Sequence, residues 1–131
     1  MPRLGVLAID PGITTGFALL DLDGVIVGMG EIQPDEIDRL KLFSQNPDIE
    51  VVMEYTPIPT LSEMNMVLRD VIARLRVMFP RHLEIKPGQW KQTPVIRHSV
   101  PNRWEDEPVT HHMRDAVRLG IYYLTFVRST K

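Results

Sequence analysis

The sequence contains no cysteine among its 131 residues. That absence excludes a disulfide framework, a thiolate nucleophile and a cysteine-based zinc site, and it fits a reducing compartment. The sequence also lacks long basic runs and any apolar run that could span a bilayer. Its first residues do not show a signal-peptide pattern. We therefore expect a cytoplasmic protein that has no membrane partner.

The composition that remains is that of an ordinary globular domain. Hydrophobic residues make up 44% and charged residues 24% of the chain, with a formal net charge of -2. This length predicts one domain over residues 1–131, with a core but without a second lobe. The near-neutral charge leaves a nucleic-acid partner open, because carboxylates that hold metal ions lower the net charge while local Lys and Arg bind phosphate.

The most informative segment covers residues 4–18. It begins as an apolar strand that ends on Asp10, and a proline and two glycines then set a turn into a second strand. A carboxylate at a strand end has lost part of its hydration and needs a cation or a donor. A metal ion would satisfy Asp10, whereas Thr14, Thr15 and the turn N–H groups could instead hold a phosphate. The plainer alternative is that Asp10 only caps the turn.

Another apolar strand, over residues 49–54 in the middle of the chain, also ends on a carboxylate, Glu54. If the strands that end on Asp10 and Glu54 are parallel neighbours, both carboxylates lie at one edge of the sheet. The other predicted elements alternate with these two strands. We expect strands over 17–22, 25–32, 49–54 and 82–86, and helices over 34–46, 60–79 and 111–127.

The connection over residues 89–110 is polar and too long for an idle loop in a small domain. It mixes cations with planar side chains, which suits contact with a nucleic-acid backbone and its bases. The candidate DNA-binding residues here are Trp90, Lys91, Arg97 and Arg103. The alternative is a solvated loop that its tryptophans hold in place.

The last predicted helix, from about His111 to about Val127, supplies two further candidates. His112 and Asp115 are one helical step apart, so both can point to the same edge of the helix interface. Taken singly, a histidine bonded to a neighbour and a surface aspartate are the simpler interpretations. The opposite side of the helix, which should face water, carries Arg114, Arg118, Thr125 and Arg128.

Together, the motifs resemble the RuvC family of Holliday junction resolvases, within the RNase H-like (retroviral integrase) superfamily. The resemblance covers essentially the whole chain and depends on three motifs in order. These are Asp10 followed by Pro-Gly-x-Thr-x-Gly, Glu54 at the end of the fourth strand, and His112-x-x-Asp115-Ala116 at the start of the last helix. Pro87-x-x-Trp90-Lys91 is similar to the family's proline-to-lysine motif.

This resemblance implies an α/β RNase H-like fold, with a five-stranded mixed sheet of three antiparallel and two parallel strands flanked by helices. It implies an endonuclease that uses two Mg²⁺ or Mn²⁺ ions, and a homodimer that cuts a four-way DNA junction. The implied ligands are Asp10, Glu54, Asp115 and His112, with Lys91 near the scissile phosphate. His111 is close enough in helical phase to replace His112.

Several alternatives stay open. Residues 55–59 and the segment after Lys91 lack the family's usual glycine-containing stretches, so this is a compact, phage-type version or a nuclease for flaps. An RNA-processing nuclease of the same fold shares the backbone chemistry. An actin- or sugar-kinase-like protein needs a second lobe that 131 residues do not provide. A non-catalytic binding module gives no reason to keep all four candidate ligands.

Overall fold

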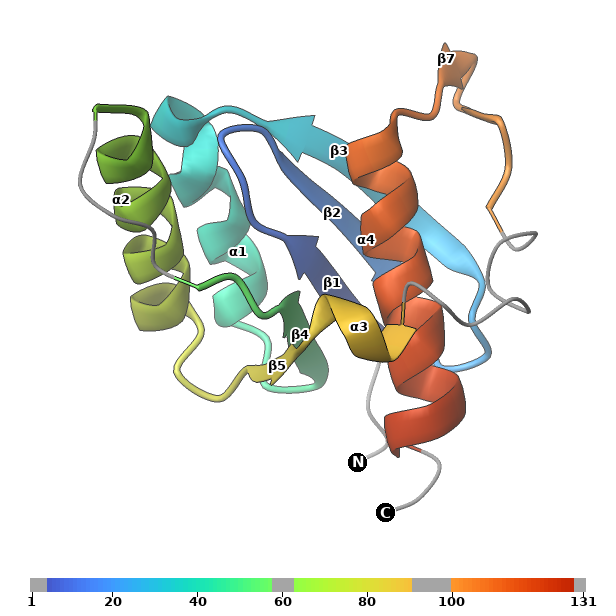
Figure 1. The fold of residues 1–131 in the computed structure, drawn as a ribbon. Helices are drawn as coiled ribbons and strands as arrows, with labels where there is room; N and C mark the ends of the chain where they lie inside the picture. The colour runs from blue at the N-terminus through green and yellow to red at the C-terminus, as the bar shows by residue number, and fades with distance from the viewer. Residues whose placement is uncertain (1–4, 58–62, 91–99, 129–131) are drawn as a thin grey trace.

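The computed structural model describes residues 5–57, 63–90 and 100–128. A five-stranded mixed sheet forms its centre, with the strand order β3-β2-β1-β4-β5 (Figure 1). The α/β fold class and the mixed sheet predicted from the sequence are therefore confirmed. The strands are β1 (Gly5–Asp10), β2 (Thr15–Leu20), β3 (Ile26–Ile32), β4 (Ile49–Glu54) and β5 (Leu83–Ile85).

The pairing of the strands follows from their connections. Short turns join β1 to β2 and β2 to β3, and both pairs are antiparallel. Longer segments lead into β4 and β5, which pair in parallel with β1 and β4 respectively. Parallel pairing needs such crossover connections, whereas antiparallel neighbours need only a turn. The expectation that the Asp10 and Glu54 strands are parallel neighbours is thus confirmed.

Helices cover both faces of the sheet (Figure 1). One face packs against α2 (Glu63–Met78) and the short helices η1 (Pro34–Leu40) and α1 (Lys41–Ser44). The predicted helix over 34–46 is therefore divided into a 3-10 helix and a single turn of α-helix. On the other face, α4 (His111–Tyr122) packs over β1, β2 and β4, as the members of the core clusters show. None of the helices among the described residues is long and apolar enough to cross a membrane.

The segment predicted as one irregular connection contains additional elements. Helix α3 (Pro87–Trp90) follows β5 directly, and the short strands β6 (Arg103–Trp104) and β7 (Glu107–Pro108) form a hairpin. The two residues between these strands, Glu105 and Asp106, have φ values of 49° and 67°. A two-residue turn with positive φ matches the twist of a hairpin, but neither residue is one of the glycines or asparagines that usually indicate such a turn.

The last helix begins as predicted and ends differently. Thr110 is its N-cap, because its hydroxyl accepts a hydrogen bond of 3.3 Å from the Met113 amide. After Tyr122 the chain continues as a π-helical segment, η3 (Tyr123–Val127). There Arg128 donates from Nε to Glu50 Oε2 at 2.7 Å. Arg128 therefore pairs with β4 while its side chain stays 36% exposed.

Candidate active site

Asp10 and Glu54 lie at the same edge of the sheet. In the parallel β1–β4 register Ile9 is opposite Met53, so the two carboxylates come next, at the strand ends. Side chains alternate between the faces of a strand. Ala8 and Val52, two residues earlier, belong to the core cluster beneath α4. Asp10 and Glu54 therefore continue the α4 face, and both residues are half-buried.

The first turn of α4 lies directly against this edge. Asp10 pairs with Gly16 across the β1–β2 turn. A β-carbon on Gly16 would overlap the backbone carbonyl of His112. The absent side chain lets the start of α4 approach the residue that faces Asp10. The first turn of α4, which carries His112, therefore lies over the strand position that pairs with Asp10.

The two histidines at the start of α4 differ in exposure. The ring of His111 lies against that of His112, with centroids 3.9 Å apart and the ring planes tilted by 39°. His111 is exposed, whereas His112 is half-buried and its backbone rests on Gly16. This arrangement favours His112 as the histidine nearer to Asp10, with His111 as its outer neighbour.

Asp115 is one turn further along α4. Its side chain is 22% exposed, and its Oδ1 lies 3.8 Å from Nη1 of Arg118. At this distance the two groups form an ion pair, but they are too far apart for a hydrogen bond. The Arg118 side chain is only 26% exposed, and among the described residues its buried Nε has no hydrogen-bond partner. The prediction that Arg118 is an ordinary water-facing cation was therefore wrong.

The threonines of the β1–β2 turn have separate roles. Thr15 is 1% exposed, and its hydroxyl donates to the Gly12 carbonyl at 3.2 Å. Thr14 is half-buried and accepts a hydrogen bond of 3.3 Å from Gln33 Nε2. Thr15 therefore stabilises the turn from within, and Thr14 is the more accessible of the two for contact with a ligand.

The predicted DNA-binding residues of the 89–110 segment do not form one group. Trp90 is 1% exposed and packs in the core with Val52 and Leu119. A buried indole offers no face to a base, so the prediction of Trp90 as a DNA-contacting residue was wrong. Arg103 is exposed and donates to the Asp106 carbonyl within the β6–β7 hairpin. Lys91 and Arg97 lie outside the described residues.

The donor set at this edge suits a hard divalent cation. Asp10, Glu54 and Asp115 offer carboxylate oxygens and His112 an imidazole, which are the ligands that Mg²⁺ and Mn²⁺ accept. Within the described part of the chain, however, no three such side chains converge into a formed metal cluster. Carboxylates gathered without a cation repel one another. Asp10 and Glu54 share this edge, and the four residues fit the ions by the chemistry of their donor atoms.

A cluster that the sequence analysis missed lies on the α2 face of the sheet, at the register position opposite Met53. Arg76 of α2 donates from Nε and Nη2 to both carboxylate oxygens of Glu84 on β5, at 3.1 and 2.8 Å. His82 contacts the same carboxylate at 2.6 Å. Hydrogen bonding from Arg76 lowers the pKa of Glu84, and His82 lowers it further, against the effect of burial. The alternation of His82 and Glu84 along a strand was the available signal, but their partner comes from another element.

The low pKa of Glu84 predicts a pH dependence of stability. Its pKa in the folded state lies below the ordinary value of 4.5, so the contribution is complete above that value and is lost as the pH falls through the lowered one. Glu84→Gln should therefore destabilise the protein at neutral pH, by about 1 kcal/mol for one charged hydrogen bond at a partly exposed site. The deficit should shrink below pH 4.5, as measured by urea unfolding at several pH values. A deficit that is constant with pH would contradict this assignment.

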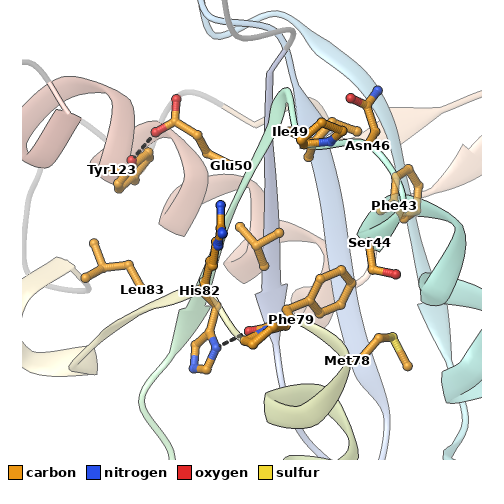
Figure 2. A pocket seen from close by; sticks show the side chains of 14 residues that line it. Phe43, Ser44, Asn46, Ile49, Glu50, Met78, Phe79, His82, Leu83 and Tyr123 are labelled. Atoms are coloured by element: carbon orange, nitrogen blue, oxygen red, sulfur yellow. Dashed lines mark hydrogen bonds between the residues drawn. The ribbon is translucent and has the colours of Figure 1, made fainter.

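A cavity lies at the opposite edge of the sheet, where the parallel strands begin. Its volume is about 450 Å³, and Figure 2 shows that Phe79, Ile49, Leu83 and Tyr123 line it. Ile49 and Leu83 begin β4 and β5, whereas the candidate site lies where the parallel strands end. The carboxylate of Glu50 at this cavity accepts from the Tyr123 hydroxyl and from Arg128. This cavity is therefore separate from the candidate active site.

Comparison with known proteins identifies the architecture. No family model and no curated protein sequence matches the chain. Two solved structures of RuvC from Thermus thermophilus match it at 15% identity. The structure in complex with a Holliday junction substrate has a TM-score of 0.68 and covers 97% of this chain and 96% of its own. The second structure has a TM-score of 0.62, and the match covers 95% of this chain and 96% of that structure's chain. The chain therefore has the RNase H-like fold of the RuvC structures.

Proposed function

We propose that the protein is a metal-dependent endonuclease that hydrolyses phosphodiester bonds in branched DNA, with four-way junctions as its substrate. One observation carries the proposal. Asp10 and Glu54 end two parallel neighbouring strands on the same face, and the start of α4, with His112, lies against the residue paired with Asp10. The similarity to a RuvC structure in complex with a Holliday junction substrate supports the choice of substrate.

Asp10, Glu54, Asp115 and His112 would hold two Mg²⁺ or Mn²⁺ ions. When bound, such ions activate a water and stabilise the leaving oxygen of an in-line phosphoryl displacement. The role of the chain is to fix these side chains at one edge and to bring the phosphate to them. Rigid support comes from the strands, whose last residues carry the carboxylates, and from the close contact of α4 with Gly16. Thr14 and Lys91 are the proposed phosphate contacts.

Cleavage of a synthetic four-way DNA junction tests the proposal. We expect nicks in Mg²⁺ and in Mn²⁺ and none in EDTA, with much less cutting of a duplex of the same sequence. Nicks placed symmetrically in two opposing strands would support a homodimer with one site per protomer. The same assay should include flap and RNA-containing substrates. Preferential cutting of either would support the proposed active site but contradict the four-way junction as its substrate. No cutting of any substrate would contradict the nuclease assignment.

A further inference from the structure

Arg118 lies on the same side of α4 as Asp115. Residues at spacings of four, three and four form one row along this helix, and its members are His111, Asp115, Arg118 and Tyr122. Tyr122, at the end of the row, packs against the core cluster that contains Val52 and Trp90. The row is therefore on the side of α4 that meets β4 and α3, and α3 lies beside α4 in Figure 1. β4 is the strand that ends on a proposed metal ligand.

The Arg118 side chain extends toward the start of α4. Side chains of an α-helix tilt toward its N-terminus, and Nη1 of Arg118 lies 3.8 Å from Oδ1 of Asp115, one turn earlier. The first turn of the same helix lies over the strand position that pairs with Asp10. A guanidinium cation is thus located next to Asp115 on the helix that borders the candidate active site.

Arg118 has a hydrogen-bond donor that no described residue accepts. Four other arginines each bring a nitrogen within 3.0 Å of a carboxylate oxygen, and these are Arg39, Arg74, Arg76 and Arg128. Arg118 stays beyond hydrogen-bond distance of Asp115, and its buried Nε has no partner among the described residues. A buried charged donor without a partner is unfavourable. This position is therefore poorly explained by a contribution to stability.

The surroundings of the guanidinium favour a phosphate as its partner. The Arg118 side chain is 26% exposed, so a ligand can reach it, while its reduced contact with water strengthens its attraction for an anion. The planar fork of arginine matches two phosphate oxygens, and the DNA backbone carries a phosphate at every nucleotide. Asp115 attracts Arg118 in the metal-free protein, and this attraction falls when Asp115 is bound to a divalent ion. The anionic backbone of the substrate is then the partner that remains.

We propose that Arg118 is a substrate-binding residue that donates hydrogen bonds to a backbone phosphate of the DNA beside Asp115. The inference rests on the proposed function, in which Asp115 is a metal ligand and branched DNA is the substrate. It adds to the proposed phosphate contacts a cation on α4 that was expected to face water.

The test is binding of a labelled four-way DNA junction in Ca²⁺, measured by fluorescence anisotropy at several salt concentrations. Arg118→Met keeps an apolar stem but removes the charge and the donors. We expect its affinity to fall about 10-fold. The slope of log affinity against log salt concentration should decrease in magnitude by about 0.9, because one phosphate contact is lost. A residue with only a structural role would leave this slope unchanged.

A conservative variant and a matched control complete the experiment. Arg118→Lys should recover the slope, because the charge is kept, and only part of the affinity, because the planar fork is lost. Arg128→Met also removes one positive charge from the end of the chain, but Arg128 is bonded to Glu50 at the opposite edge of the sheet. Affinity and slope should be those of the wild type in this control. Arg118→Gln applies the same test if Arg118→Met fails to fold.

The outcomes separate this inference from the proposed function. An unchanged salt slope in a folded Arg118→Met variant, or an equal loss in Arg128→Met, would overturn the role of Arg118 while junction cleavage by the wild type still stands. Failure of Arg118→Lys to recover the slope would overturn it as well. A wild-type protein that neither binds nor cuts the junction would overturn both.

Discussion

Asp10→Asn is expected to abolish junction cleavage while junction binding is retained or strengthened. The substitution removes a metal ligand but preserves the size of the side chain. Loss of about 4 kcal/mol of transition-state stabilisation corresponds to about a 1,000-fold slower reaction. Binding should not suffer, because one anionic charge is removed from a site that must accept a phosphate. Single-turnover cleavage and a mobility-shift titration in Ca²⁺ measure the two quantities separately.

Asp23→Asn is the matched control for that experiment. Asp23 is also an acidic residue beside β2, but it lies in the exposed β2–β3 turn, away from the sheet edge that carries Asp10. Its neighbour Asp21 accepts the hydrogen bonds from the turn amides, so the turn geometry does not depend on Asp23. Cleavage should proceed at the wild-type rate. Full Mg²⁺-dependent activity in Asp10→Asn would exclude Asp10 from the metal site and remove the main support for the nuclease proposal.

The part of the site that could be predicted is the part that strand geometry determines. Asp10 and Glu54 each end an apolar strand, and a parallel pair aligns its strand ends, so their meeting needs no knowledge of the helices. The position of His112 also followed from local signals, because Thr110 is an ordinary N-cap and sets where the helix begins. Local chemistry and one packing rule were sufficient for these residues.

The features that sequence reasoning missed depend on contacts between distant segments. Trp90 was assigned to DNA because its neighbours are polar, but α4 covers it and the ring fills the core beside Leu119. Arg76 and Glu84 are eight residues apart, and their pairing needs the packing of α2 against β5. Arg128 reaches Glu50 across 78 residues of sequence. The periodicity of hydrophobic residues predicts where helices and strands lie, but it does not specify which charged side chains of different elements will pair.

Gly16→Ala is expected to have the largest effect on stability of any single methyl addition near the site. An alanine β-carbon would overlap the carbonyl oxygen and carbon of His112, which are backbone atoms and cannot rotate away. The helix cannot simply slide, because Gly120 holds its other end closely against Leu20 and Ala8. Overpacking in a core costs typically about 1–3 kcal/mol, and a clash with backbone belongs at the upper end of that range or beyond it.

Gly28→Ala isolates this packing effect from the general effect of replacing glycine in a strand. Gly28 lies on β3, and a β-carbon there would meet no atom within 4 Å. Its free energy of unfolding should stay within about 0.5 kcal/mol of wild type, whereas Gly16→Ala should lose about 3 kcal/mol. Urea denaturation of both variants measures the difference.

The same substitution also tests how the site is assembled. In Gly16→Ala the start of α4 must move away from the strand that pairs with β1, taking His112 and Asp115 away from Asp10. Cleavage should therefore fall more than the loss of folded protein explains, when it is measured at a temperature where the variant is fully folded. Equal stability of the two alanine variants would show that α4 does not rest on Gly16. Wild-type cleavage by a folded Gly16→Ala protein would show that the position of His112 does not limit the reaction.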